Sequence, residues 1–337
     1  MTTLTRAIAT VTVPALALTA EAACAARARE LRPAAAPPDH AQLWQAPDDI
    51  ASRDLYLGPG GADFVPTREP FTFVAHDRTG TSPGFDVRDG AGRAWDVKQG
   101  TEAQSEVAAS RILWAIGYHQ PPTHYVEQWT LTGNGAGSAE GPQTSGRFRP
   151  DRVALEREIG EWAWDENPFI GTRPFGGLIV ANLMLNSWDW KASNNKIYDF
   201  LPGVTRDQIG TLPMRRYVVR DLGASLGKTS YPTLLKWFRL RGFGQGSRND
   251  LEDFESQRFL LASEDGRPHF DYRGIYNHVV DAVVFEDVRW TCALLSRLSD
   301  KQLDDAFRAG GYSPADRARY ITKLKDKTQQ GLRTRED

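Results

Sequence analysis

Cysteine is scarce in this chain of 337 residues, which has only Cys24 and Cys292. Two cysteines cannot supply the network of disulfides on which small secreted scaffolds depend. The six histidines show neither the His-x-His nor the His-Glu-x-x-His spacing of a zinc site. Ser225, within Gly223-Ala224-Ser225-Leu226-Gly227, is interpreted as part of a tight turn rather than a nucleophile elbow. These observations argue against a disulfide scaffold, a zinc enzyme and a serine hydrolase.

An excess of one charge sign is also missing. The chain has 41 Lys and Arg against 43 Asp and Glu, a formal net charge of −2. Bulk electrostatics therefore give no reason to expect a nucleic-acid partner. Long hydrophobic runs are missing too, since the weakly apolar run Ala7 to Ala20 is too short to cross a membrane as a helix. We expect no transmembrane span.

The N-terminal segment has some features of an export signal. Arg6 precedes the apolar run, and Ala20-Glu21-Ala22 resembles a cleavage site. Residues 1–22 are predicted to be a possible signal peptide, which favours a periplasmic or secreted protein. An Ala-rich disordered tail on a cytoplasmic protein is the alternative. Residues 23–40 are predicted to be an Ala/Pro linker.

The most informative pattern lies in the middle of the chain. Asp189 is followed by Lys191 and Asn194, and an apolar strand further on ends at Asp221-Leu222-Gly223. Phosphoryl transfer needs one carboxylate to orient the acceptor hydroxyl, and an amide oxygen with a second carboxylate to hold Mg²⁺. Asp189 is predicted to be the catalytic carboxylate, and Asn194 and Asp221 the metal ligands. Lys191 is predicted to neutralise the transferred phosphoryl group.

Plainer interpretations of these residues stay open. Asp189, Asn194 and Asp221 could cap a helix or shape a turn, and Lys191 could be a simple loop lysine. Asn195 is the alternative metal ligand if the register slips by one residue.

A candidate phosphate-binding lysine lies upstream. Residues 85–98 predict two alternating strands around a Gly-rich turn, with Lys98 at the end of the second strand. A helix is predicted directly after it, over 102–116. A strand lysine paired with a helix glutamate is how kinases hold the ammonium that binds the α and β phosphates. Glu106 is the predicted partner of Lys98, and Glu102 is the alternative.

A small-residue segment is predicted to cover the nucleotide phosphates. It spans Thr79 to Gly84 and contributes Gly80, Thr81, Ser82 and Gly84. Small residues allow backbone N–H groups to approach phosphate oxygens closely. The same composition also makes an ordinary hairpin turn, so both interpretations stay open.

The order Lys98, Glu106, Asp189, Asn194, Asp221 is the order of kinase site residues along a chain. On these residues the chain resembles the atypical protein-kinase-like superfamily: HipA toxin kinases, CotH spore-coat kinases, secretory-pathway kinases and phosphoinositide kinases. It also resembles a bacterial branch through the run from Val97 to Arg111. The likeness covers roughly residues 52–325 and is concentrated in 79–118 and 180–227.

Three departures separate the chain from the eukaryotic protein kinases proper. Ser187-Trp188 replaces His-Arg before Asp189, the metal motif is Asp-Leu-Gly rather than Asp-Phe-Gly, and no Gly-x-Gly-x-x-Gly loop precedes Lys98. These departures leave the acceptor substrate open.

The resemblance implies an α+β, bilobal protein-kinase-like fold, with a β-rich N-lobe that has one main helix and a mostly helical C-lobe. The lobes are predicted over 41–150 and 151–330, with a polar tail over 331–337. The sequence further predicts a long loop over 133–146, a buried helix over 176–186, strands at 196–198 and 217–219, a mobile loop over 242–248, and helices at 283–297, 301–308 and 314–330.

The resemblance also implies an ATP-dependent phosphotransferase that uses Mg²⁺ or Mn²⁺. The γ-phosphoryl group would move to a hydroxyl on a protein, a glycan or a small molecule. Two alternatives on the same fold are a pseudokinase that binds without turnover and an enzyme that transfers AMP. A structural protein that carries these residues by coincidence is a third, and in that case Lys98, Glu106 and Asp221 would not meet in space.

Overall fold

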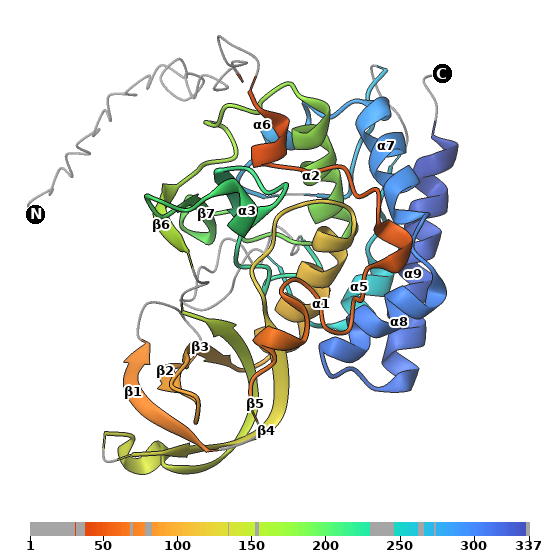
Figure 1. Ribbon diagram of the computed structural model, residues 1–337. Helices are drawn as coiled ribbons and strands as arrows, with labels where there is room; N and C mark the ends of the chain where they lie inside the picture. Colours follow the sequence, from red (N-terminus) through yellow and green to blue (C-terminus); the bar gives the residue numbers. More distant parts are fainter. Residues whose placement is uncertain are drawn as a thin grey trace, which may run out of the picture. The chain divides into compact units, whose positions relative to one another are not determined.

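The computed structural model describes residues 31, 38–67, 70–77, 83–133, 135–151, 155–229, 246–261, 266–272 and 274–334 (Figure 1). All of these residues fall within one compact unit, Leu31–Asp337. The predicted signal peptide and most of the predicted linker lie outside the described residues. Export therefore stays a prediction.

The N-terminal part of this unit is built around a five-stranded barrel. Its strands are listed in chain order: β1 (Phe71–Asp77), β2 (Gly84–Arg88), β3 (Ala94–Gln99), β4 (His124–Thr132) and β5 (Gly141–Pro150). They form a closed barrel in the order β1-β2-β3-β5-β4, with β1 and β4 pairing in parallel. Alternation along the strands buries one side-chain set inside, including Phe71, Val87, Trp95, Val97 and Phe148.

The predicted long loop over 133–146 is wrong in its second half. Residues from Gly141 onward belong to β5, and Gln128 faces Thr144 in the β4–β5 ladder. The indole of Trp129 also donates to the carbonyl of Thr144 at 3.0 Å. The Gly, Ser and Thr content predicted a loop, but pairing with a neighbouring strand overrides such weak local preferences.

One long helix, α1 (Glu102–Ala115), follows β3 directly and agrees with the predicted helix. It packs against β5 of the barrel and against α8 (Asp300–Ala309). Most of its side chains are buried, including the ionisable Glu102, Glu106 and Arg111. A helix buried on all sides can place charged groups in the interior only if they are paired.

The C-terminal part is mostly helical. The predicted helix over 176–186 is α2 (Arg173–Met184), whose N-cap Thr172 accepts a hydrogen bond from Phe175 N. It packs against α7 (Phe285–Leu295) and α9 (Pro314–Arg333). Shorter elements complete this part: α3 (Arg206–Ile209), α5 (Leu251–Ser256) and α6 (Asn277–Val280), with the 3-10 turn η5 (Ala192–Asn194). Four further 3-10 turns belong to the N-terminal part: η1 (His40–Gln42), η2 (Ile50–Ser52) and η3 (Gly61–Phe64) precede β1, and η4 (Gly137–Ala139) lies between β4 and β5.

A second sheet contains the two strands predicted near residues 197 and 218. Its order is β6-β7-β8, formed by β6 (Glu156–Glu161), β7 (Asn195–Phe200) and β8 (Arg215–Val219). All pairings are antiparallel. The predicted α+β composition, sheet-rich first and helical later, is confirmed. Among the described residues, no helix combines the length and apolar character that a membrane span requires.

Candidate active site

Lys98 lies near the end of β3, opposite Gly84 on β2 and Arg147 on β5. Its Nζ is 2.6 Å from Glu102 Oε2 and 3.0 Å from Asp221 Oδ2. Glu106 Oε2 is further away, at 3.8 Å. The structure therefore brings the Asp-Leu-Gly aspartate to a strand lysine and a helix carboxylate that lie more than a hundred residues earlier in the sequence.

The carboxylate nearest to Lys98 is that of Glu102 rather than that of the predicted partner, Glu106. The two glutamates are four residues apart on α1 and therefore share one face of the helix. Glu106 is 1% exposed, and its Oε1 pairs with Arg147 Nε at 3.0 Å and Arg149 Nη1 at 3.3 Å. Because two guanidinium groups hold Glu106, the ammonium of Lys98 is closer to Glu102.

Two arginines of β5 belong to the site although they were not among the predicted site residues. Arg147 and Arg149 flank the core residue Phe148, and both also contact Asp96 on β3, Arg147 at 3.1 Å. Burial would raise the pKa of Asp96, but the two guanidinium groups outweigh it and hold that pKa well below its ordinary value. The sequence pattern that could have indicated these arginines is the Arg-Phe-Arg alternation, which is typical of a strand with one buried and one polar face.

Asp221 lies two residues after the end of β8 and is separated from it by Arg220. The backbone N–H groups of Arg220 and Asp221 both donate to the carbonyl of Asn194, at 2.9 and 3.2 Å. The Gly223 N–H donates to Asp221 Oδ1 at 3.1 Å. Burial opposes ionisation of Asp221, but the charge of Lys98 and the hydrogen bond from Gly223 prevail and lower its pKa to about 2. The carboxylate is therefore ionised at neutral pH.

The loop from Asp189 to Asn194 is held to Asp221 through the backbone of Asn194. The side-chain amide of Asn194 donates to the carbonyl of Asp189 at 2.7 Å. Lys191 Nζ pairs with Asp189 Oδ1 at 3.0 Å, at the protein surface. Asn195, the alternative ligand, is buried instead and donates to the carbonyl of Trp162 at 3.1 Å. The arrangement favours Asn194 as the amide near Asp221.

Aromatic packing holds the loop from Asp189 to Asn194 in place. The ring of Trp190 stacks between Trp164 and Tyr272, with centroid distances of 4.5 and 5.1 Å. Its indole N–H donates to the carbonyl of Ser187 at 3.0 Å. Trp188 N donates to the carbonyl of Ala224 at 3.2 Å, which joins the loop to the segment after Asp221. The tryptophans that flank Asp189 therefore restrict where its carboxylate can lie.

A buried lysine of α9 supports the start of the same loop. Lys327 Nζ donates to the carbonyl of Met184 at 2.9 Å and to Asn186 Oδ1 at 2.7 Å. Asn186 has a positive φ of 52°, and its amide donates to the carbonyl of Gly227 at 2.6 Å. These bonds stabilise a left-handed backbone that non-glycine residues rarely adopt. They link α2, α9 and the segment beyond Gly223.

Gly223 is where the metal motif touches α1. A Cβ atom at this position would lie 2.8 Å from Glu102 Cβ. The hydroxyl of Ser105 donates to the Gly223 carbonyl at 2.7 Å. The contact requires glycine because the nearest atom belongs to a helix side chain close to its backbone.

Gly223→Ala is expected to destabilise the protein by about 1–3 kcal/mol through overpacking. It should also lower nucleotide binding, because the added methyl group separates Glu102 from Asp221 and so pulls apart the groups around Lys98. Urea unfolding and nucleotide titration check both effects. Gly90→Ala is the matched control, because a Cβ there meets nothing within 4 Å. Equal stability of the two variants would show that the Gly223 contact tolerates a methyl group.

The predicted phosphate-covering segment can be located only in part. Gly80, Thr81 and Ser82 lie outside the described residues. Gly84 is buried as the first residue of β2, where a Cβ would lie 3.0 Å from Asp77 Cβ. β1 and β2 form an antiparallel pair, so the segment that connects them joins β2 beside Gly84, the strand partner of Lys98.

The site has few ligands for a cation. Among the described residues, no group of three or more His, Cys, Asp or Glu side chains could hold a metal ion. Mg²⁺ in kinases is bound through one or two carboxylates together with phosphate oxygens and water, rather than by a protein cage. Asp221 and the Asn194 amide therefore fit a cation that arrives with a nucleotide. They do not fit a permanently bound structural ion.

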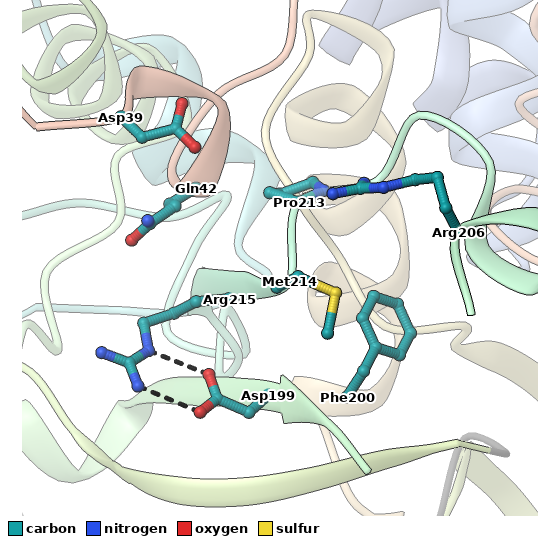
Figure 2. A pocket seen from close by; sticks show the side chains of 8 residues that line it. All are labelled: Asp39, Gln42, Asp199, Phe200, Arg206, Pro213, Met214 and Arg215. Carbon is teal, nitrogen blue, oxygen red and sulfur yellow. Dashed lines mark hydrogen bonds and ion pairs between the residues drawn. The ribbon is translucent and has the colours of Figure 1, made fainter. Parts of the chain in front are cut away.

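A pocket of about 370 Å³ lies elsewhere, at the other end of β7 (Figure 2). Its lining residues are Asp39, Gln42, Asp199, Phe200, Arg206, Pro213, Met214 and Arg215. Arg215 and Asp199 form a bidentate ion pair in it, at 2.9 and 3.0 Å. From Asn195 to Phe200 the strand rises about 16 Å. The pocket contains none of the predicted site residues.

No protein-family model matches the chain, and no curated protein does. Among solved structures, the Helicobacter pylori proinflammatory kinase CtkA is similar, with 12% identity, a TM-score of 0.42, and coverage of 79% of this chain and 97% of that chain. The Golgi casein kinase follows with 6% identity, a TM-score of 0.36 and coverage of 79% and 72%. The Golgi casein kinase with Mn/ADP bound shows 7% identity, a TM-score of 0.35 and coverage of 79% and 73%. All three are kinases, at low sequence identity.

Proposed function

We propose that this chain is an ATP-dependent phosphotransferase that moves the γ-phosphoryl group to a hydroxyl on a protein, a glycan or a small molecule. One observation carries the proposal. Lys98 from β3, Glu102 and Glu106 from α1, and Asp221 after β8 converge within 2.6–3.8 Å of one ammonium group. Lys98 and the two glutamates are close in the sequence, so the contact that supports the proposal most is the one with Asp221, which lies 123 residues after Lys98.

Each residue then has a role that its position supports. Lys98 binds the α and β phosphates, as a strand lysine with a helix carboxylate does in kinases. Asp221 and the Oδ1 of Asn194 hold Mg²⁺ or Mn²⁺, which when bound offsets the negative charge of the phosphates. The Asn194 side chain is oriented for this role because its Nδ2 donates to the carbonyl of Asp189.

Asp189 orients the acceptor hydroxyl and takes its proton. Its side chain is 25% exposed, so an acceptor can reach it from solvent. Lys191 lies beside it and can offset charge on the transferred group. Because both groups are accessible from solvent, a protein, a glycan and a small alcohol all stay candidate acceptors.

A pseudokinase is the second candidate, and one contact favours it. Lys98 donates to both oxygens of Asp221, at 3.3 and 3.0 Å, while Gly223 N also donates to Oδ1. This ion pair competes with a cation for the same oxygens of Asp221. A protein in which it stays closed would bind nucleotide weakly and transfer nothing.

The test is to incubate the full chain with Mg²⁺ or Mn²⁺ and with ATP labelled at the γ or at the α position. We expect γ-label to move to the protein itself or to an added acceptor. Transfer of α-label alone would indicate AMP transfer. Metal-dependent binding without transfer of either label would support the pseudokinase. Absence of metal-dependent binding would overturn every nucleotide function proposed for this site.

A further inference from the structure

Residues 246–250 lie against the segment that follows the metal motif. Ser247 N donates to the Lys228 carbonyl at 3.0 Å, and Asp250 N donates to the Leu226 carbonyl at 2.8 Å. A Cβ on Gly246 would lie 1.8 Å from the Lys228 carbonyl oxygen, so glycine is required for this close approach. The mobile loop predicted over 242–248 lies partly outside the described residues, which begin again at Gly246, and Ser247 is held there by its backbone hydrogen bond to Lys228.

Arg248 extends from this anchored segment into the site. Its Nη1 forms an ion pair with Glu102 Oε1, while Glu102 Oε2 pairs with Lys98 at 2.6 Å. Its guanidinium also lies over the ring of Trp188, 5.5 Å from the centroid. The Trp188 indole donates to the Ser247 carbonyl at 2.7 Å. Arg248 therefore contacts both Glu102, the partner of Lys98, and Trp188, the residue before Asp189.

The charges around Lys98 explain how the ion pair between Arg248 and Glu102 affects nucleotide binding. Three carboxylates approach its ammonium, and Glu106 is already neutralised by the arginines of β5. With Arg248 on one oxygen, Glu102 offers Lys98 only its other oxygen. Without Arg248, both oxygens of Glu102 would attract the ammonium and compete with nucleotide phosphates for it.

We propose that Arg248 is a positioning residue for phosphoryl transfer, acting through Glu102 on Lys98 and through Trp188 on the loop that carries Asp189. The inference rests on the proposed function and deepens it. The residues after the metal motif thereby set how firmly the site binds nucleotide. Arginine suits this role because its planar group can form an ion pair and stack on an aromatic ring together.

The test measures kcat, KM for ATP and the Kd of Mg·ADP for Arg248→Ala, Glu102→Gln and the double variant. We expect Arg248→Ala to raise KM and Kd about tenfold, corresponding to about 1.4 kcal/mol, with a smaller fall in kcat. The double variant should be no worse than the worse single variant, because both changes act on one contact. Arg248→Lys should restore part of the affinity.

Arg319→Ala is the matched control, since that arginine pairs with Glu252 and Glu255 at the surface. Additive effects of Arg248→Ala and Glu102→Gln would overturn the inference. So would a loss of thermal stability in Arg248→Ala with KM and Kd unchanged, because a merely structural role predicts that result. If the unmodified chain binds no Mg·ADP, the proposed function fails first and the inference fails with it.

Discussion

Asp221→Asn is expected to lower phosphoryl transfer by about 10³-fold while leaving the protein folded. Asp221 is the one carboxylate proposed to hold the cation, and asparagine keeps its shape but removes its charge. The contacts of its backbone with Asn194 do not depend on the side chain. We therefore expect loss of metal-dependent nucleotide binding in a protein that still folds, with a thermal unfolding midpoint lowered by the loss of the Lys98–Asp221 ion pair.

The measurement is γ-label transfer and nucleotide titration with and without Mg²⁺. Asp199→Asn is the control, because Asp199 also pairs with a cation, Arg215, but lies at the remote pocket (Figure 2). It should leave transfer unchanged. If Asp221→Asn keeps metal-dependent transfer, the cation is held by other groups and the assignment of Asp221 is wrong.

The pKa of Asp221 adds a prediction about acid. Its folded-state value is about 2, below the ordinary 3.8, because Lys98 and Gly223 N favour the charged form over the effect of burial. The ion pair thus stabilises the folded state fully above pH 3.8, and this contribution is lost as the pH falls through 2. Asp221 should therefore cause no acid limb in the activity profile above about pH 4. Such a limb near neutral pH would indicate a different titrating group.

The parts of the site that could be predicted from sequence depend on local patterns. Lys98 and the helix with Glu106 follow each other directly, so strand alternation and helical spacing were enough to find both. The interval from Asp189 to Asn194 is similarly short. Asp221 was found because it ends an apolar strand. In each case the determining residues are neighbours in the chain, where periodicity carries information.

The missed parts depend on contacts between distant segments. Glu102 and Glu106 are equivalent by helical spacing, and only the arginines of β5 decide which of them Lys98 approaches. Those arginines were hidden because the preceding residues predicted a loop. Arg248 reaches Glu102 across more than a hundred residues of sequence, and no local pattern reports such a contact. Contacts between distant segments therefore determine which of the alternatives left open by the sequence the protein adopts.

Arg149→Met is expected to destabilise the protein by about 3–5 kcal/mol, the cost of breaking a buried ion pair by removing one partner. Arg149 is one of the two arginines of β5 that form ion pairs with Asp96 and Glu106. Glu106 is 1% exposed, so its charge cannot turn to water when the guanidinium is lost. Arg147 would then be the remaining guanidinium that contacts both carboxylates, with Arg220 4.0 Å from Asp96 and Lys98 3.8 Å from Glu106. Urea unfolding monitored by circular dichroism measures the change.

Two further variants separate charge from packing. Arg157→Met, at an exposed position of β6, is the matched control and should change stability by less than about 0.5 kcal/mol. Adding Asp96→Asn to Arg149→Met should recover part of the loss, because Arg147 would then neutralise Glu106 without also having to neutralise Asp96. If the double variant is no more stable than Arg149→Met, the loss comes from packing rather than charge.

The same substitution should weaken nucleotide binding before the protein unfolds. With Arg149 gone, Glu106 is less well neutralised and attracts Lys98, which is 3.8 Å away. The ammonium would move toward α1 and away from the phosphates and Asp221. The Kd of Mg·ADP should therefore rise at urea concentrations where Arg149→Met is still fully folded. An unchanged Kd would mean that β5 stabilises the fold without controlling the position of Lys98.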